Sequence, residues 1–226
     1  MVIWPILAVI FAGLEVLALR KNVPQLEYLA KPAVMVCLLL WLFTTSGLQG
    51  QLLWFGVGIL FSLAGDVVLM ISLDRLFIPG LAMFLLAHLS YLAGFQEQLL
   101  NPTGWSFILL LVIFLNGYRL LRRIAGAMRG GGHDRWVTAV IVYGLIISLM
   151  LYAALSTIFD PAWGTGAAFL VSAGAFLFYI SDLILAWNKF VAPFQNSRIY
   201  NMVAYHLGQI GLIAGVISQF GVRIPP

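Results

Sequence analysis

Residues 136–159 read WVTAVIVYGLIISLMLYAALSTIF, a run of 24 residues without a charged side chain. At 1.5 Å per residue, a helix of that length is about 36 Å long and exceeds the roughly 30 Å hydrocarbon layer of a bilayer. The run therefore predicts a transmembrane helix. Further uncharged runs occur on both sides of it, at 32–65, 76–96, 98–118, 161–181 and 199–222.

The composition extends this interpretation to the whole chain. Of its 226 residues, 9% are charged and 62% are hydrophobic, and the mean hydropathy is +1.03. Soluble domains have about 25% charged residues, and so few charges could not cover a water-exposed surface. This excludes a water-soluble enzyme, a nucleic-acid-binding module and a disordered chain, so we expect a lipid bilayer and no nucleic acid as partner. We predict an all-α membrane protein with one integral-membrane domain over 1–226 and eight transmembrane helices near 3–19, 32–46, 52–71, 79–96, 104–121, 136–158, 163–187 and 199–220.

Basic residues are distributed unevenly between the predicted connections. The first, third, fifth and seventh connections hold 11 of the 12, and only Arg223 follows the last span. Since Lys and Arg gather in cytoplasmic loops, the odd connections are predicted to face the cytoplasm and both termini to face away from it. We expect a multi-pass protein of the bacterial inner (cell) membrane. The eleven residues are Arg20, Lys21, Lys31, Arg75, Arg119, Arg122, Arg123, Arg129, Arg135, Lys189 and Arg198.

Five ionisable side chains lie inside the predicted spans, where they are costly and usually mark function. They are Glu15, Asp66, His88, Asp182 and His206. Counted from the predicted cytoplasmic ends of their helices at 1.5 Å per residue, all five lie roughly 7 to 14 Å below that surface. We therefore expect one polar pocket that opens to the cytoplasm.

A short motif occurs twice in the chain. GDVVL at 65–69 on the third span resembles SDLIL at 181–185 on the seventh, and a histidine follows on the next span in both cases. An offset of four spans leaves the two halves running in the same direction. This indicates a parallel 4+4 pseudo-duplication about an axis along the membrane normal, as in some transporters, and it would bring the two aspartates toward the centre.

Six fragments, taken together and in order, are more specific than any one of them. They are Lys31-Pro32, Gly65-Asp66, Gly80-Leu81, FLLAHLSY at 84–91, Ser181-Asp182-Leu183 and YHLGQ at 205–209. In this combination nearly the whole chain resembles the YhhN-type family of integral-membrane proteins, which includes lysoplasmalogenases. The resemblance implies eight spans and hydrolysis of the vinyl ether bond of a lysoplasmalogen, a single-chain lysophospholipid, to a fatty aldehyde and a glycerophospho-base.

The acids of the predicted pocket suit that reaction. A vinyl ether hydrolyses when an acid protonates its β-carbon and water captures the resulting oxocarbenium ion, which requires one neutral carboxyl and one carboxylate. Two buried carboxyls close together do not both ionise easily. We predict Asp66 and Asp182 as this pair. The side chains predicted to orient them or relay protons are His88, Tyr91, Tyr205 and His206.

A second set of polar side chains is predicted to bind the substrate. Lys31, Lys189 and Arg198 lie at the predicted cytoplasmic mouth and suit the phosphate of a head group. Gly58 and Ser62 lie one helical turn apart and leave room for a lipid tail. The full set is Glu15, Lys31, Ser62, Asn188, Lys189, Arg198, Asn201 and Gln209.

Two other functions fit the same residues. In a metal-dependent membrane lipid hydrolase, two histidines and two or three carboxylates would bind Zn²⁺ and activate its water. In a lipid or small-molecule transporter, the parallel repeat and the intramembrane acids would form the binding site. The chain contains no HExxH motif and no close pair of histidines. We therefore expect neither a metal nor a cofactor.

Overall fold

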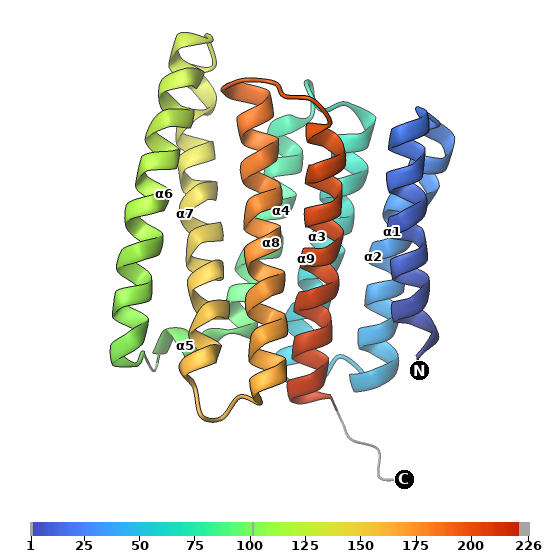
Figure 1. Cartoon of the computed structure of the whole chain (residues 1–226), viewed down its shortest axis with the longest axis vertical. Helices are drawn as coiled ribbons and strands as arrows, with labels where there is room; N and C mark the ends of the chain where they lie inside the picture. The colour runs from blue at the N-terminus through green and yellow to red at the C-terminus, as the bar shows by residue number, and fades with distance from the viewer. Residues whose placement is uncertain (1, 101, 222–226) are drawn as a thin grey trace.

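The computed structural model describes residues 2–100 and 102–221. Within these ranges helices are the only regular secondary structure, and eight of them are long and apolar enough to cross a membrane, which confirms the predicted all-α class and the number of spans. The elements are α1 (Ile3–Lys21), α2 (Pro24–Ser46), α3 (Gln51–Ile71), α4 (Phe77–Gly94), the short α5 (Gln96–Leu100), α6 (Gly104–Gly130), α7 (Asp134–Ser156), the 3₁₀ turn η1 (Thr157–Phe159), α8 (Thr165–Phe190) and α9 (Ser197–Phe220) (Figure 1).

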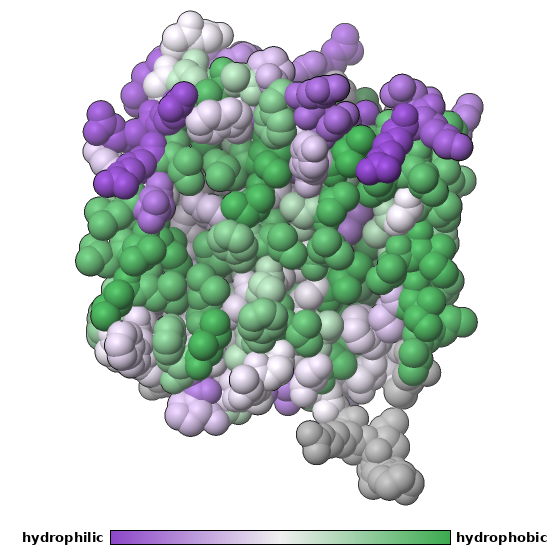
Figure 2. Space-filling view, in the orientation of Figure 1, coloured by the Kyte–Doolittle hydropathy of each residue, from purple (hydrophilic) through white to green (hydrophobic). Residues whose placement is uncertain are grey.

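The eight long helices alternate in direction and form one bundle (Figure 1). Helices α1, α3, α6 and α8 end where α2, α4, α7 and α9 begin, and we call this the basic end because it holds Arg20, Lys21, Arg75, Arg129 and Lys189. Figure 2 shows hydrophilic residues gathered there above a broad apolar band. Helix α1 begins and α9 ends at the opposite end. Arg223, the one basic residue predicted beyond the last span, lies outside the described residues.

Helix α2 differs most from its predicted range. It begins at Pro24, whereas the predicted second span begins at 32. Proline is favourable at the first position of a helix, since its fixed φ suits the helix and the N–H that it lacks would have no helical partner there. Pro32 lies inside the helix and does not end it. As a result, Lys31 lies within α2 and faces the bundle interior, not in the first connection as expected.

Helix α6 is also longer than predicted. It continues to Gly130, whereas the predicted span ends at 121. The additional turns carry arginines and lie beyond the hydrocarbon layer, so no charged side chain has to be buried in lipid. The other long helices agree with their predicted ranges to within about three residues, the accuracy expected of helix boundaries.

Helices α8 and α9 are in backbone contact. A Cβ added at Gly174 would lie 2.4 Å from the backbone nitrogen of Leu212, and one added at Gly208 would lie 2.7 Å from that of Phe178. Only glycine permits so close an approach. This contact fixes the polar residues of α9 relative to Asp182 on α8.

Candidate active site

A cavity of about 460 Å³ reaches the basic end between α2, α3, α8 and α9. Its walls combine apolar side chains with acidic, basic and amide groups, which is typical of a site that holds an amphipathic ligand. Seven of the predicted site residues line it: Lys31, Asp66, Asp182, Asn188, Arg198, Asn201 and Tyr205.

Asp66 is held from two sides. The ammonium Nζ of Lys31 on α2 lies 3.1 Å from Asp66 Oδ1, and the hydroxyl of Tyr205 on α9 donates a hydrogen bond of 2.7 Å to Asp66 Oδ2. The side chains of Lys31 and Asp66 are 8% and 1% exposed, so water screens this ion pair little. A positive charge so close favours the carboxylate form of Asp66.

Asp182 is held by a tyrosine and a histidine. Its Oδ2 accepts a hydrogen bond from the Tyr143 hydroxyl on α7 and lies 3.2 Å from Nε2 of His88 on α4. The Tyr143 hydroxyl and His88 Nε2 are themselves 3.0 Å apart, so the three groups form a triangle. Within the described part of the chain, Asp182 forms no ion pair with a Lys or Arg, and its Oδ1 makes no hydrogen bond.

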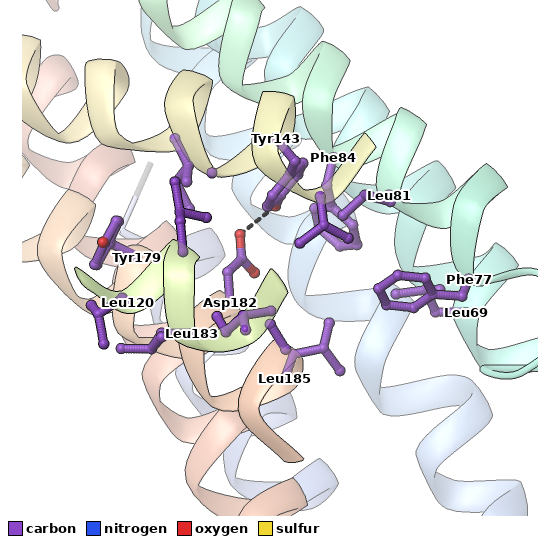
Figure 3. Close-up of a pocket in the computed structure, with 16 residues that line it drawn as sticks. Leu69, Phe77, Leu81, Phe84, Leu120, Tyr143, Tyr179, Asp182, Leu183 and Leu185 are labelled. Atoms are coloured by element: carbon purple, nitrogen blue, oxygen red, sulfur yellow. Dashed lines mark hydrogen bonds between the residues drawn. The ribbon is translucent and has the colours of Figure 1, made fainter. Parts of the chain in front are cut away.

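An apolar pocket lies on the other side of Asp182, between α4, α6, α7 and α8 (Figure 3). Figure 3 shows Asp182 and Tyr143 joined by their hydrogen bond among aliphatic and phenyl side chains. Four residues line both this pocket and the polar cavity: Leu69, Phe84, Asp182 and Leu185. Asp182 therefore lies where a polar space and an apolar space meet, the arrangement needed for a lipid whose reacting bond joins its head group to its chain.

Glu15 and His206 form a separate pair between α1 and α9. Both side chains are fully buried, and Glu15 Oε2 contacts His206 Nε2. Neither residue lines the cavity, and His88 reaches it only through its contact with Asp182. The expectation that all five intramembrane ionisable groups line one pocket is therefore wrong. The five residues lie at similar depth, but their side chains leave their helices in different directions. They therefore form three separate sets: Asp66 with its partners, Asp182 with His88, and the Glu15–His206 pair.

Tyr91, Gln209 and Ser62 form a buried chain of hydrogen bonds. The Tyr91 hydroxyl donates to Gln209 Oε1 at 2.7 Å, and Gln209 Nε2 donates to Ser62 Oγ at 3.0 Å. The Tyr91 ring covers Gly58 so closely that an added Cβ would lie 2.1 Å from its Cε1. The lipid-tail path expected along Gly58 and Ser62 is therefore wrong, because the Tyr91 ring occupies it.

Two ion pairs lie at the rim of the cavity. Lys189 Nζ is 2.8 Å from Asp74 Oδ1, and Arg198 pairs with Glu27. The hydrogen bond from Lys189 and its positive charge lower the pKa of the exposed Asp74 carboxyl below its usual range. Arg198 lines the cavity, whereas Lys189 lies beside it. Both cations are close enough to the basic end to meet a head group.

Several neighbours of the predicted residues were not expected. Tyr143 lies nine residues after the start of α7 and Asp182 eight before the end of α8, which places both about 12 to 14 Å deep. The depth of Tyr143 along its helix could thus have placed it at the level of Asp182, although the run 136–159 that contains it looks purely apolar. The backbone carbonyl of Ser181 accepts a hydrogen bond of 2.5 Å from Asn201 Nδ2, which a sequence cannot indicate.

Among the described residues, no three His, Cys, Asp or Glu side chains are grouped so that they could hold a metal ion.

Known proteins resemble this chain over most of its length. The human lysoplasmalogenase TMEM86B is 32% identical over 187 residues, which cover 80% of this chain and 71% of that protein. The human lysoplasmalogenase TMEM86A is 33% identical over 185 residues, covering 76% and 70%, and a lysoplasmalogenase homolog of Dictyostelium discoideum is 26% identical over 262 residues, covering 98% and 85%. No solved structure matches the chain significantly. The family model YhhN matches residues 26–216, and the chain belongs to the YhhN family.

Proposed function

We propose that this protein is a membrane-embedded lysoplasmalogenase that hydrolyses the vinyl ether bond of a single-chain lysophospholipid. The observation that carries the proposal is the position of two carboxyls in unlike surroundings. Asp66 and Asp182 line one polar cavity, and Asp182 also lines the apolar pocket next to it. The names of the relatives TMEM86B and TMEM86A support the same reaction.

The two spaces assign the two halves of the substrate. The first carbons of the alkenyl chain occupy the apolar pocket behind Asp182, which has a volume of about 60 Å³, and the glycerol and head group occupy the polar cavity. The phosphate lies toward the rim, where Arg198 and Lys189 exchange part of their present ion pairs for charge-assisted hydrogen bonds to it. The vinyl ether bond then lies beside Asp182, because this residue lines both spaces where they meet.

Asp182 is assigned as the acid. In its neutral form it donates a proton to the carbon β to the ether oxygen, and the alkenyl group becomes an oxocarbenium ion at the carbon that carries the oxygen. Asp66, whose carboxylate form is favoured by the ion pair with Lys31, stabilises this cation and takes a proton from the water that attacks it. The Asp182 carboxylate then takes the hydroxyl proton of the hemiacetal, while the protonated Asp66 gives its proton to the departing glycerol oxygen. Aldehyde and alcohol form, and both carboxyls return to their starting states.

Several residues position these carboxyls without touching the reacting atoms. Tyr143 and His88 hold the Oδ2 edge of Asp182 and leave Oδ1 for the proton that is transferred. Tyr205 holds Asp66. Five further members of the predicted site act one step further away, since their hydrogen bonds fix α9 against α1, α3 and α4: Glu15, Ser62, Tyr91, His206 and Gln209. Asn188 and Asn201 line the polar cavity on the head-group side.

We infer that the basic end faces the cytoplasm, because positively charged loops remain on that side. The substrate then enters from the cytoplasmic leaflet, and the membrane is the bacterial inner (cell) membrane. This orientation rests on the charge distribution, which places Arg20, Lys21, Arg75, Arg129 and Lys189 at one end of the bundle.

The test is cleavage by the purified protein in lipid nanodiscs. A 1-alkenyl lysophosphatidylethanolamine should release free fatty aldehyde, whereas its 1-alkyl ether analogue should stay intact because it has no double bond to protonate. Asp182→Asn serves as the inactive control. Cleavage of a 1-acyl analogue in place of the vinyl ether would refute the proposal. Passage of the lipid across proteoliposomes without bond cleavage would refute it in favour of the transporter.

A further inference from the structure

A second groove lies on the flank of the bundle, away from the candidate active site. It has a volume of about 450 Å³ and runs between α6 and α7, within the roughly 300–1,000 Å³ typical of small-molecule sites. Its members on α6 recur every three or four residues from 113 to 129, so they form one helical face. Helix α6 stands at the edge of the bundle beside α7 (Figure 1). Within this face Gly117 and Ala125 are buried against the bundle, whereas Tyr118, Arg122 and Gly126 are exposed, so the groove opens to the lipid.

The groove is apolar along most of its length and basic at one end. Gly117, Ala125 and Gly126 leave room at the helix surface, and a Cβ added at Gly126 would meet no atom within 4 Å. Arg122 and Arg129 lie on the same face toward the basic end. The groove thus has the polarity of a phospholipid, with cations at the head-group level and small residues below.

The two arginines have no counter-charge within the part of the chain that the structure describes. Lys31, Lys189 and Arg198 each pair with an acid, but among the described residues no Asp or Glu pairs with Arg122 or Arg129. Helix α6 itself contains no acidic residue. Arg122 lies over the Tyr118 ring, 5.6 Å from its centre, a contact that orients the guanidinium without neutralising it.

The depth of these arginines matches that of a lipid phosphate. Arg122 lies 18 residues after the start of α6 and Arg129 lies 25, which correspond to roughly 27 and 37 Å along the helix. With a hydrocarbon layer of roughly 30 Å, Arg122 lies near its boundary and Arg129 among the head groups. The two residues are seven positions apart, or about 10 Å along the helix, so a phosphate between them meets both guanidinium groups once that of Arg122 turns from the Tyr118 ring toward Arg129.

We propose that this groove binds one phospholipid with an anionic head group from the leaflet at the basic end. Its phosphate lies between Arg122 and Arg129, and one acyl chain lies along Gly117, Ala125 and Gly126. An anionic lipid fits better than a zwitterionic one, because basic pockets between transmembrane helices that lack counter-charges select negative head groups.

This lipid is distinct from the substrate. Leu121 packs against Gly144 so closely that a Cβ added at Gly144 would lie 2.4 Å from Leu121 Cδ2. This contact between α6 and α7 separates the groove from the apolar pocket behind Asp182. The bound lipid therefore stabilises α6 at the edge of the bundle and takes no part in the reaction.

The experiment is native mass spectrometry of the detergent-solubilised full chain titrated with phosphatidylglycerol or phosphatidylcholine. The wild type should retain one phosphatidylglycerol and bind phosphatidylcholine more weakly. Arg122→Gln/Arg129→Gln should weaken phosphatidylglycerol binding by about 30-fold, given the usual contribution of each basic residue near an anionic lipid. The matched control is Arg20→Gln/Lys21→Gln, which removes two charges from the same end on the distant α1 and should bind as the wild type does.

A second variant keeps the charges and fills the groove. Gly126→Leu should weaken phosphatidylglycerol binding while leaving vinyl ether hydrolysis in micelles unchanged, because its side chain points into open space away from Asp182. Equal binding of the two lipids would overturn the proposal, as would undiminished phosphatidylglycerol binding by both altered proteins. A dimer that the groove variants dissociate, with no lipid retained by the wild type, would assign the face to a second copy and also overturn it.

Discussion

Replacing Lys31 by methionine separates two roles for this residue. If Lys31 held the substrate phosphate, as the sequence predicts, the change would raise KM and leave kcat nearly intact, since a remote contact is felt equally in ground and transition states. In the structure Lys31 is committed to Asp66. We therefore expect kcat to fall by at least about 10²-fold, the lower range for loss of an acid or base, with little change in KM.

The size of the stability effect follows from burial. The ion pair is 3.1 Å long, and its side chains are 8% and 1% exposed. Removing one partner of a buried pair leaves an uncompensated charge and costs about 3–5 kcal/mol of unfolding free energy, whereas neutral groups of similar shape in place of both can cost almost nothing. Lys31→Met should thus be strongly destabilised, and Lys31→Met/Asp66→Asn should regain most of the loss while remaining inactive.

The assay is equilibrium unfolding in mixed micelles of dodecyl sulfate and mild detergent, together with steady-state kinetics of aldehyde release. Arg198→Gln, at the exposed rim, is the matched control and should affect KM more than kcat. A Lys31→Met protein with wild-type kcat and a raised KM would refute the assignment. Equal stability of the single and double variants would refute the ion pair itself.

Three further outcomes are expected. Asp66→Asn and Asp182→Asn should each lower turnover by at least about 10²-fold, and the double variant should be little worse than either, because members of one catalytic unit are non-additive; a folded single variant that keeps most of its activity in aldehyde release would lose its assigned role. Single cysteines at Gly131 and Thr103, at opposite ends of α6, should react with membrane-impermeant maleimide from opposite sides, and labelling from one side would contradict the topology. Activity should survive exhaustive chelation, since an acid is needed to protonate carbon; activity lost to chelator and restored by Zn²⁺ would support the metal-dependent alternative.

Depth along the chain made much of the site predictable. The sequence predicts similar levels in the membrane for Asp66 and Asp182, and both line the cavity. Hydropathy sets where each helix enters and leaves the bilayer, and the rise per residue then sets the depth of every side chain. These quantities require no knowledge of how the helices pack.

The partners within the layer were not predictable in the same way. Lys31 meets Asp66, and Tyr205 meets it from 139 positions away in the chain. Such contacts depend on which helices are neighbours and on how each is rotated, and both are decided by packing. The position of Lys31 inside a helix was also hard to predict, because the following Pro32 looks like a helix start but lies inside α2.

The internal repeat remains a prediction, although the contacts of the two aspartates support it. Asp66 on α3 is held by side chains of α2 and α9, and Asp182 on α8 by side chains of α7 and α4. A 4+4 duplication relates α3 to α8, α2 to α7 and α4 to α9, so each carboxyl is held by the helices that correspond to those around the other. Each half thus supplies one carboxyl and a partner for the carboxyl of the other half.

Hydrolysis in D₂O tests most directly whether a carboxyl acid protonates the vinyl ether carbon. The aldehyde released from a 1-alkenyl lysophospholipid is reduced with borohydride as it forms, and the alcohol is analysed by mass spectrometry; preformed aldehyde treated identically corrects for exchange. Protonation by Asp182 predicts one deuterium at the carbon next to the former aldehyde carbon, at a rate that falls with Asp182→Asn. Product without deuterium at that carbon would show that the bond breaks without carbon protonation and would contradict the mechanism.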